Sequence, residues 1–165
     1  MAKVCILGGG FIGRFYAESL CGRRGKDIVT VVYARKKETA IRFATDYQVA
    51  HYTTEMEGAI AHAETEFVVI ALPNYLHEEA VMLCVKHKKA VLCTKPLGRT
   101  AAEALRMTLA CEEAGVFAGY LEDLCYTPKF LKSVKRTETD SKLFALAVPV
   151  AFNSSAVSSG RMFKR

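Results

Sequence analysis

The sequence has no long hydrophobic run. No window contains the stretch of about 18 apolar residues that a membrane-spanning helix requires. A charged and then apolar leader is also missing, because the pattern of a buried strand already begins at Lys3. These absences predict a cytoplasmic protein that does not interact with membranes.

The cysteines show no arrangement that indicates a bridge or a metal site. They lie at positions 5, 21, 84, 93, 111 and 125, with no Cys-x-x-Cys pair and no histidine at ligand spacing. This scatter argues against a disulfide framework and a zinc centre, and it predicts reduced thiols. Several cysteines fall within apolar runs, where the thiol packs as a small core side chain. No bound metal is expected.

Net charge is absent from most of the chain. Residues 1–128 contain 15 basic and 15 acidic side chains, whereas residues 129–165 contain 8 basic and 2 acidic ones and so carry the whole surplus of +6. A basic arm could contact nucleic acid, but this one has no interleaved aromatic side chains and no recognisable motif. A solvated helix face and tail is the better explanation, and no nucleic-acid partner is expected.

What the sequence does contain is a regular alternation of two patterns. Short apolar runs, typical of buried strands, alternate with runs that have one apolar face, typical of helices. The expected strands are residues 4–7, 27–34, 49–52, 67–72, 90–93 and 116–121. The expected helices are residues 14–20, 36–47, 56–62, 75–87 and 128–136. A further helix is expected to begin at the capping box Thr100-Ala-Ala-Glu103 and to end at Gly115.

Strands that alternate with helices pair in parallel through right-handed crossovers. The expected fold is therefore α/β, a doubly wound and mainly parallel sheet of the Rossmann type, which binds ligands at the C-terminal ends of its strands. We expect this dinucleotide-binding domain to cover residues 1–140. Residues 141–165 are expected to form an atypical tail, with one candidate strand at 143–152 and a flexible Ser-rich end.

A glycine-rich turn with the spacing Gly8-x-Gly10-x-x-Gly13 follows the first expected strand. In a dinucleotide-binding turn, the first glycine permits a sharp bend and the second lets the backbone approach a pyrophosphate. The third lets the helix pack closely on the strand. The phosphates would bind at the helix N-terminus, where free N–H groups and the helix dipole favour an anion. The alternative is a glycine-rich turn that binds no ligand.

The end of the second expected strand bears on the choice of cofactor. An NAD site usually has a carboxylate there, about 20 residues after the last glycine, to bind the ribose 2′-hydroxyl. This chain instead has Ala34 followed by Arg35, Lys36 and Lys37. These cations suit a 2′-phosphate, so we expect NADP, with NAD as the alternative. An ordinary basic helix start is the other interpretation, although cations there oppose the helix dipole.

Two later strand ends carry titratable side chains. His77 follows the fourth strand on the apolar face of the next helix, where a structural or positioning role is favoured over proton transfer. Lys95 leaves the C-terminal end of the fifth strand, where a nicotinamide ring would lie. There its ammonium group can polarise or protonate a substrate oxygen. Taken alone, Lys95 is also compatible with an ordinary loop lysine.

Together these motifs resemble the glucose–fructose oxidoreductase, inositol dehydrogenase and MocA (Gfo/Idh/MocA) family. The matching stretches are Gly8-Gly-Gly-Phe-Ile-Gly13, Ala71-Leu-Pro-Asn-Tyr-Leu-His77, Thr94-Lys-Pro-Leu97 and Gly119-Tyr-Leu-Glu-Asp-Leu-Cys-Tyr-Thr-Pro128. The glycine motif is common to many nucleotide-binding folds, whereas the Pro-Asn-x-x-His and Lys-Pro combination is more specific. The resemblance covers about residues 1–140.

The resemblance implies an NAD(P)-dependent oxidoreductase that acts on a sugar, cyclitol or related alcohol or carbonyl carbon. It assigns Lys95 as the catalytic lysine that assists proton transfer. The residues it implies at the cofactor are Gly8, Gly10, Phe11, Ile12, Gly13, Arg35, Leu72, Pro73, Asn74, His77, Thr94, Lys95 and Glu122. No metal ligand is implied.

The chain departs from the family pattern at two points. The usual Glu-Lys-Pro is Thr94-Lys95-Pro96, so the family's carboxylate is replaced by a hydroxyl. Family members also continue into a second α/β domain that forms most of the substrate pocket, and this chain does not resemble that domain. We therefore expect impaired activity and self-association through exposed apolar surface. The alternative function is a non-catalytic NAD(P)-binding module or redox-sensing subunit that needs a partner chain.

Overall fold

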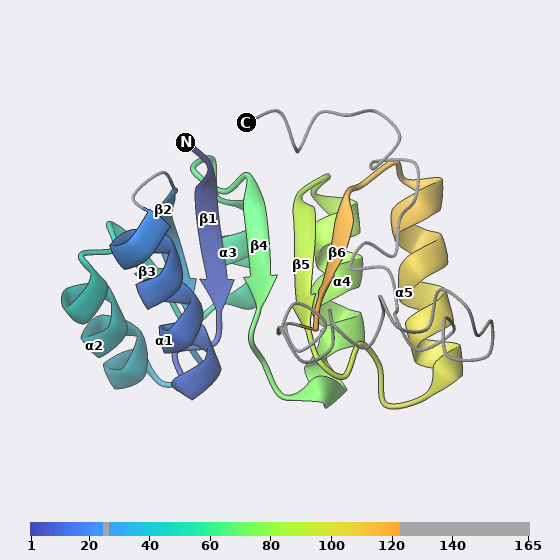
Figure 1. Ribbon diagram of the computed structural model, residues 1–165, viewed down its shortest axis with the longest axis horizontal. Coiled ribbons are helices and arrows are strands. Elements are labelled where there is room, and N and C mark those ends of the chain that lie inside the picture. Colours follow the sequence, from blue (N-terminus) through green and yellow to red (C-terminus); the bar gives the residue numbers. More distant parts are fainter. Residues whose placement is uncertain (25–26, 123–165) are drawn as a thin grey trace, which may run out of the picture.

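The computed structural model describes residues 1–24 and 27–122, which form a six-stranded sheet flanked by helices (Figure 1). The strands are β1 (Lys3–Leu7), β2 (Ile28–Tyr33), β3 (His51–Thr53), β4 (Phe67–Ile70), β5 (Ala90–Thr94) and β6 (Ala118–Leu121). Their order is β3-β2-β1-β4-β5-β6, and every neighbouring pair is parallel. The doubly wound fold predicted from the sequence is confirmed.

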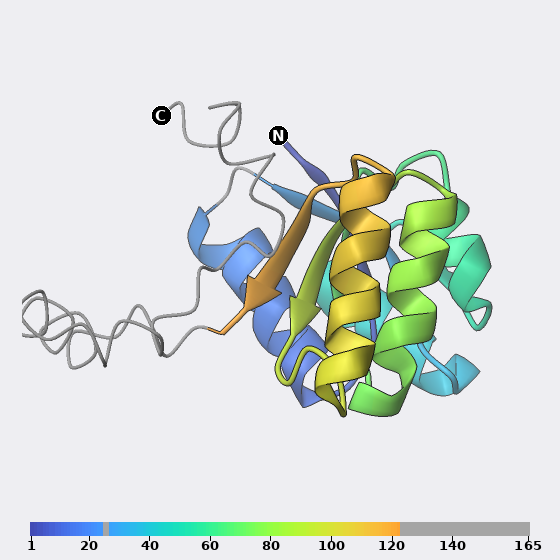
Figure 2. The same ribbon diagram turned by 90° about the vertical axis from the view of Figure 1, so that its right-hand side faces the viewer.

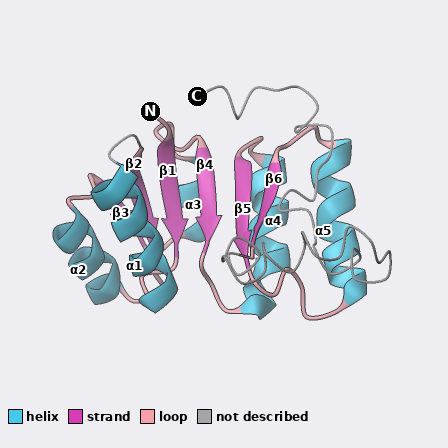
Figure 3. Ribbon diagram, viewed as in Figure 1, coloured by secondary structure: helices cyan, strands magenta, loops and turns pink. Residues whose placement is uncertain are grey.

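Helices lie on both faces of the sheet, as the side view in Figure 2 and the element colours in Figure 3 show. They are α1 (Phe11–Glu18), which continues as the π-helix η1 (Ser19–Arg24), α2 (Lys37–Tyr47), α3 (Met56–Ala61), the 3₁₀ turn η2 (Asn74–Leu76), α4 (His77–Lys86) and α5 (Ala101–Glu113). One face carries α1 and α2, and the other carries α3, α4 and α5. None of the helices in the described residues is long and apolar enough to cross a membrane.

The central strand β1 is buried on both faces, so its apolar residues are continuous rather than alternating with polar ones. Val4 and Ile6 pack with Phe43 in the core beneath α1 and α2, while Cys5 and Leu7 pack in the core beneath the other three helices. From β1 the chain moves outward first to β2 and β3, and then in the opposite direction to β4, β5 and β6. The loops after β1 and β4 therefore leave on opposite faces, which opens a crevice between them.

Several expected element boundaries were wrong. The fourth strand ends at Ile70 rather than residue 72, and the sixth strand begins at Ala118 rather than residue 116. The first helix begins at Phe11 rather than residue 14, because it starts directly after Gly10. The third strand begins at His51 rather than residue 49. Gln48 ends α2 in the left-handed conformation (φ 54°), and the Val49 N–H donates to the Ala44 carbonyl at 2.9 Å, so Val49 belongs to the helix end. The helix expected at 128–136, the strand at 143–152 and the domain boundary at 140 lie outside the described residues.

The N-terminus of α5 is held by a modified capping box. The Thr100 hydroxyl accepts a hydrogen bond from the Glu103 N–H at 3.2 Å, as expected. The Glu103 carboxylate reaches one residue further back, where it accepts from the Arg99 N–H at 2.8 Å and from the Arg99 guanidinium at 2.6 Å. These bonds from the Arg99 side chain, and then from its backbone, lower the pKa of Glu103 below its ordinary value.

This lowered pKa predicts a pH-dependent contribution to stability. A carboxyl group with a lower pKa in the folded state stabilises the fold above its unfolded pKa, and the contribution is lost as pH falls through the folded pKa. We expect Glu103→Gln to unfold at lower urea concentration than the wild type at neutral pH, with the gap closing in acid. Glu112→Gln, at an exposed position of the same helix, is the control. A gap that persists at low pH would contradict this role of the ion pair.

Candidate functional site

The turn after β1 needs glycine at two positions for reasons internal to the protein. Gly8 has a positive φ of 116°, and a Cβ added there would overlap the Ala71 carbonyl oxygen of the loop after β4. A Cβ at Gly13 would overlap the Gly8 carbonyl oxygen. The first turn of α1 therefore packs directly on the backbone of the turn.

Gly10 differs, because no contact within the described residues requires a glycine there. Its φ of −81° suits any residue, and an added Cβ would meet no atom of residues 1–24 or 27–122 within 4 Å. Gly10 is the N-cap of α1, and no side chain caps the helix. The first N–H groups of α1 therefore face open space at the positive end of the helix dipole. This cradle, which a side chain would fill, fits a pyrophosphate group.

On one side of the glycine turn lies a cavity of about 320 Å³, here called the cation-lined cavity. Its lining residues are Gly8, Gly9, Tyr33, Ala34, Arg35, Lys36, Thr39, Leu72, Pro73, Tyr75 and Leu76. Arg35 and Lys36 are exposed in the loop between β2 and α2. The cavity thus combines two cations with aromatic and apolar walls, a composition that suits a phosphorylated nucleoside.

Thr39, Tyr33 and Tyr75 also line this cavity and were not predicted from the sequence. Thr39 lies in the first turn of α2, and its methyl group would be 2.9 Å from a Cβ added to Gly9. The available signal was helical spacing, because Thr39 stands three positions after Lys36 and shares its side of the helix start.

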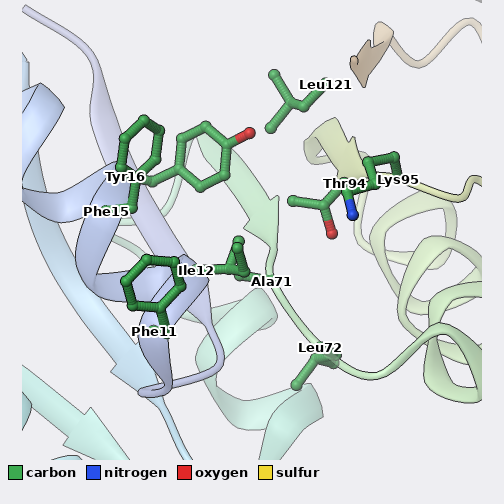
Figure 4. Close-up of a pocket in the computed structure, with 9 residues that line it drawn as sticks. All are labelled: Phe11, Ile12, Phe15, Tyr16, Ala71, Leu72, Thr94, Lys95 and Leu121. Atoms are coloured by element: carbon green, nitrogen blue, oxygen red, sulfur yellow. The ribbon is translucent and has the colours of Figure 1, made fainter. Parts of the chain in front are cut away.

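On the other side of the turn lies a second cavity of about 300 Å³, the lysine cavity (Figure 4). Its lining residues are Phe11, Ile12, Phe15, Tyr16, Ala71, Leu72, Thr94, Lys95 and Leu121. Figure 4 shows the four side chains of α1 on one wall, with Thr94 and Lys95 opposite them at the end of β5. Leu72 lines both cavities and lies at the junction between them.

Thr94 and Lys95 have different environments although they are adjacent. Thr94 is buried, and its hydroxyl donates to the Ile70 carbonyl of β4 at 2.8 Å. The Thr94 hydroxyl, which stands where the family pattern has a glutamate carboxylate, is therefore hydrogen-bonded to the backbone of the sheet. Lys95 is exposed and forms no ion pair within the described residues.

The remaining predicted residues lie around these cavities rather than on their walls. His77 is 1% exposed and lies beneath the cleft at the start of α4. Asn74 is exposed in η2, and Glu122 follows β6. None of these three lines either cavity, whereas the glycine turn, Arg35 and Lys95 are brought to the same edge of the sheet.

Apolar side chains of α1 are exposed at the entrance of the lysine cavity. Phe11 is 83% exposed, Phe15 is 50% exposed and Ile12 is also exposed. They follow one another along α1 at helical spacing, so they form one continuous apolar surface. Self-association through such a surface stays a prediction.

The five cysteines in the described residues are free thiols, and four of them are buried. Burial raises the pKa of Cys5 and of Cys93 to about 12. Buried thiols of this kind remain protonated at neutral pH and pack as core side chains rather than acting as nucleophiles. In the same residues, no three His, Cys, Asp or Glu side chains gather to hold a metal ion.

Comparison with known families shows to which of them the chain belongs. Residues 2–120 match the Gfo/Idh/MocA family, described as an oxidoreductase family with an NAD-binding Rossmann fold. The chain belongs to the Gfo/Idh/MocA oxidoreductase family. The resemblance seen in the sequence motifs is therefore confirmed, and so is NAD(P) binding as the property of the fold.

Individual relatives show both forms of the cofactor. The chain is 35% identical over 111 residues to an uncharacterized oxidoreductase, YgjR, of Escherichia coli K12, covering 67% of this chain and 33% of that protein. It is 31% identical over 136 residues to the scyllo-inositol 2-dehydrogenase (NADP(+)) IolU of Bacillus subtilis 168. This match covers 82% of this chain and 41% of that protein. Among solved structures, GenD2 from gentamicin A biosynthesis in complex with NAD matches with a TM-score of 0.76 at 28% identity. This match covers 82% of this chain and 38% of the GenD2 chain.

The glycine turn yields a matched pair of variants. Gly10→Ala should leave the midpoint of thermal unfolding almost unchanged, because the new Cβ meets no protein atom, but should weaken dinucleotide binding. Gly13→Ala should lower the midpoint strongly, because its Cβ overlaps the Gly8 carbonyl oxygen. Differential scanning fluorimetry with and without NADPH measures both effects. If Gly10→Ala binds the dinucleotide as tightly as the wild type, the cradle does not hold the pyrophosphate.

Proposed function

We propose that this chain is the NADP(H)-binding part of an oxidoreductase that transfers hydride to or from a sugar, cyclitol or related alcohol or carbonyl carbon. The observation that carries the proposal is the cleft at the C-terminal strand ends, where a cation-lined cavity and a cavity beside Lys95 flank one glycine turn. The name of the Bacillus subtilis relative supports both the substrate class and NADP.

The preference for NADP rests on the cation-lined cavity. Arg35 and Lys36 are placed to pair with a 2′-phosphate, and the Thr39 side chain is a further candidate contact. None of the lining residues is an aspartate or glutamate. Within the described part of the chain, the cavity wall therefore offers no carboxylate to accept hydrogen bonds from the ribose hydroxyls of NAD or to repel a phosphate.

Arg35→Ala tests this preference. Loss of a charge-assisted contact should raise the Kd for NADPH about tenfold or more and leave the Kd for NADH almost unchanged. Arg42→Ala, which removes an exposed cation elsewhere on α2, is the matched control. Isothermal titration calorimetry measures both ligands. Tighter binding of NADH than of NADPH by the wild type would refute the NADP assignment.

Lys95 is proposed as the residue that handles the proton. When bound, the dinucleotide supplies or accepts the hydride, which is chemistry that protein side chains lack. When a carbonyl substrate is reduced, the Lys95 ammonium group can donate a hydrogen bond and then a proton to the substrate oxygen. In the reverse direction, the neutral Lys95 amine can accept the proton of the alcohol. The apolar α1 wall opposite it would limit access of water to the reacting atoms.

Lys95→Ala should lower kcat/KM about a hundredfold or more, the usual contribution of general acid–base catalysis, while the Kd for NADPH changes little. Lys86→Ala is the control, since Lys86 pairs with Glu57 far from the cleft. The assay is NADPH oxidation with a panel of keto sugars and inosose-type ketones, followed at the nicotinamide absorbance band. Intact turnover in Lys95→Ala would overturn the assignment.

The alternative function is a non-catalytic NAD(P)-binding module or redox-sensing subunit completed by a partner chain. The chain spans 33% and 41% of the length of the two curated relatives described above. NADPH binding by the purified chain without turnover of any substrate in the panel would support this alternative.

A further inference from the structure

His77 joins two segments of the cleft that are far apart in the sequence. Its Nε2 lies 2.9 Å from the Leu72 carbonyl oxygen, in the segment after β4. Its Nδ1 lies 3.0 Å from the Pro96 carbonyl oxygen and 3.2 Å from that of Leu97, in the segment after β5. The ring is 1% exposed, so water does not compete for these contacts.

The position of this contact is significant because the sheet ends just before it. The ladder between β4 and β5 extends only to the pair Ile70 and Cys93. Beyond it, among the described residues, side chains rather than backbone hydrogen bonds connect the two segments: the Thr94 hydroxyl at the ladder's end, and His77 further out. His77 therefore acts on the part of the second segment that follows Lys95.

We propose that His77 is a positioning residue: its contact with the Pro96 carbonyl oxygen holds the Lys95 segment at the start of α4, beside the Leu72 segment, and so fixes Lys95 relative to the dinucleotide. This inference rests on the proposed function, since it concerns the placement of Lys95. It differs from the role expected from the family resemblance, in which His77 lines the cofactor cleft. In this proposal the imidazole lies beneath the cleft and contacts the backbone carbonyl groups of Leu72 and Pro96, which belong to the two cleft walls.

The two sides of the ring require separate tests. A neutral imidazole donates from only one nitrogen, and the carbonyl oxygens on both sides are acceptors. The third neighbour is the Cys93 sulfur, 3.4 Å from Nδ1. Burial raises the pKa of that thiol to about 12, so it remains protonated at neutral pH and offers the ring no anionic partner.

Three substitutions of His77 separate the contacts. Asparagine places its amide nitrogen near the position of Nδ1 and can keep the contact with Pro96. Glutamine places its amide nitrogen near the position of Nε2 and can keep the contact with Leu72. Phenylalanine retains the ring volume and makes neither contact. His87→Phe is the matched control, because His87 lies at the other end of α4 and contacts Glu57.

The first measurement needs no ligand. Backbone ¹⁵N relaxation of the full chain gives order parameters for the amides of Leu97 and Gly98, which follow the contact. We expect ordered values in the wild type, His87→Phe and His77→Asn, and values below about 0.6 in His77→Gln and His77→Phe. Unchanged order parameters in His77→Gln would overturn the proposed clamp, and the glutamine variant decides this even if phenylalanine prevents folding.

The second measurement connects the clamp to Lys95. Acetylation of Lys95 by acetic anhydride is quantified by mass spectrometry, with and without saturating NADPH, well below the unfolding temperature of each variant. Protection by NADPH should be about threefold to tenfold weaker in His77→Gln than in the wild type, and His77→Asn should restore it. Equal protection in both variants at saturation would refute the positioning role, because a merely structural residue would change only stability.

The two proposals fail in different ways. If the wild type binds neither NADPH nor NADH, the proposed function is wrong, and the positioning role of His77 falls with it. The order parameters still decide whether His77 joins the two segments. If NADPH binds and protects Lys95 equally in all variants, the proposed function stands and the positioning role is refuted.

Discussion

The cleft depends on one steric constraint, the direct contact of the first turn of α1 with the backbone of the turn after β1. A Cβ at Gly13 would overlap the Gly8 carbonyl oxygen. A Cβ at Gly8 would overlap the Ala71 carbonyl oxygen. Three backbone segments, from β1, α1 and the loop after β4, thus meet with no side chain between them. This contact fixes the direction of α1 and so positions both its N-terminus, where the proposed pyrophosphate would bind, and the apolar wall of the lysine cavity.

The elements that could be predicted from the sequence are those set by local patterns. Apolar β-branched runs identified the strands, and their alternation with helices predicted a parallel sheet, because such connections allow little else. The glycine spacing, Arg35 and Lys95 were predicted at the C-terminal strand ends, where the structure brings them together. The spacing of Thr39 from Lys36 indicated its side of α2, but its contact with Gly9 joins two elements whose relative position no local pattern encodes.

His77 illustrates the same limit in a different way. The helical pattern correctly predicted that it faces the interior beside Val81 and Cys84, which are also buried. Its partners are backbone carbonyl groups of two segments, and any residue type can supply a carbonyl group. No side chain in the sequence therefore indicates the contact, and only the folded backbone reveals that one imidazole lies between carbonyl groups of both walls of the cleft.

The junction at Leu72 has an evolutionary consequence. The cations that would choose between two dinucleotides lie on the α2 side of this side chain, and the lysine that would handle a proton lies on the β5 side. If the proposed function holds, substitutions near Arg35 would change the preferred dinucleotide without disturbing the residues around Lys95. Such independence allows a single scaffold to serve different metabolic redox pools, in keeping with relatives that bind NAD in one case and are named for NADP in another.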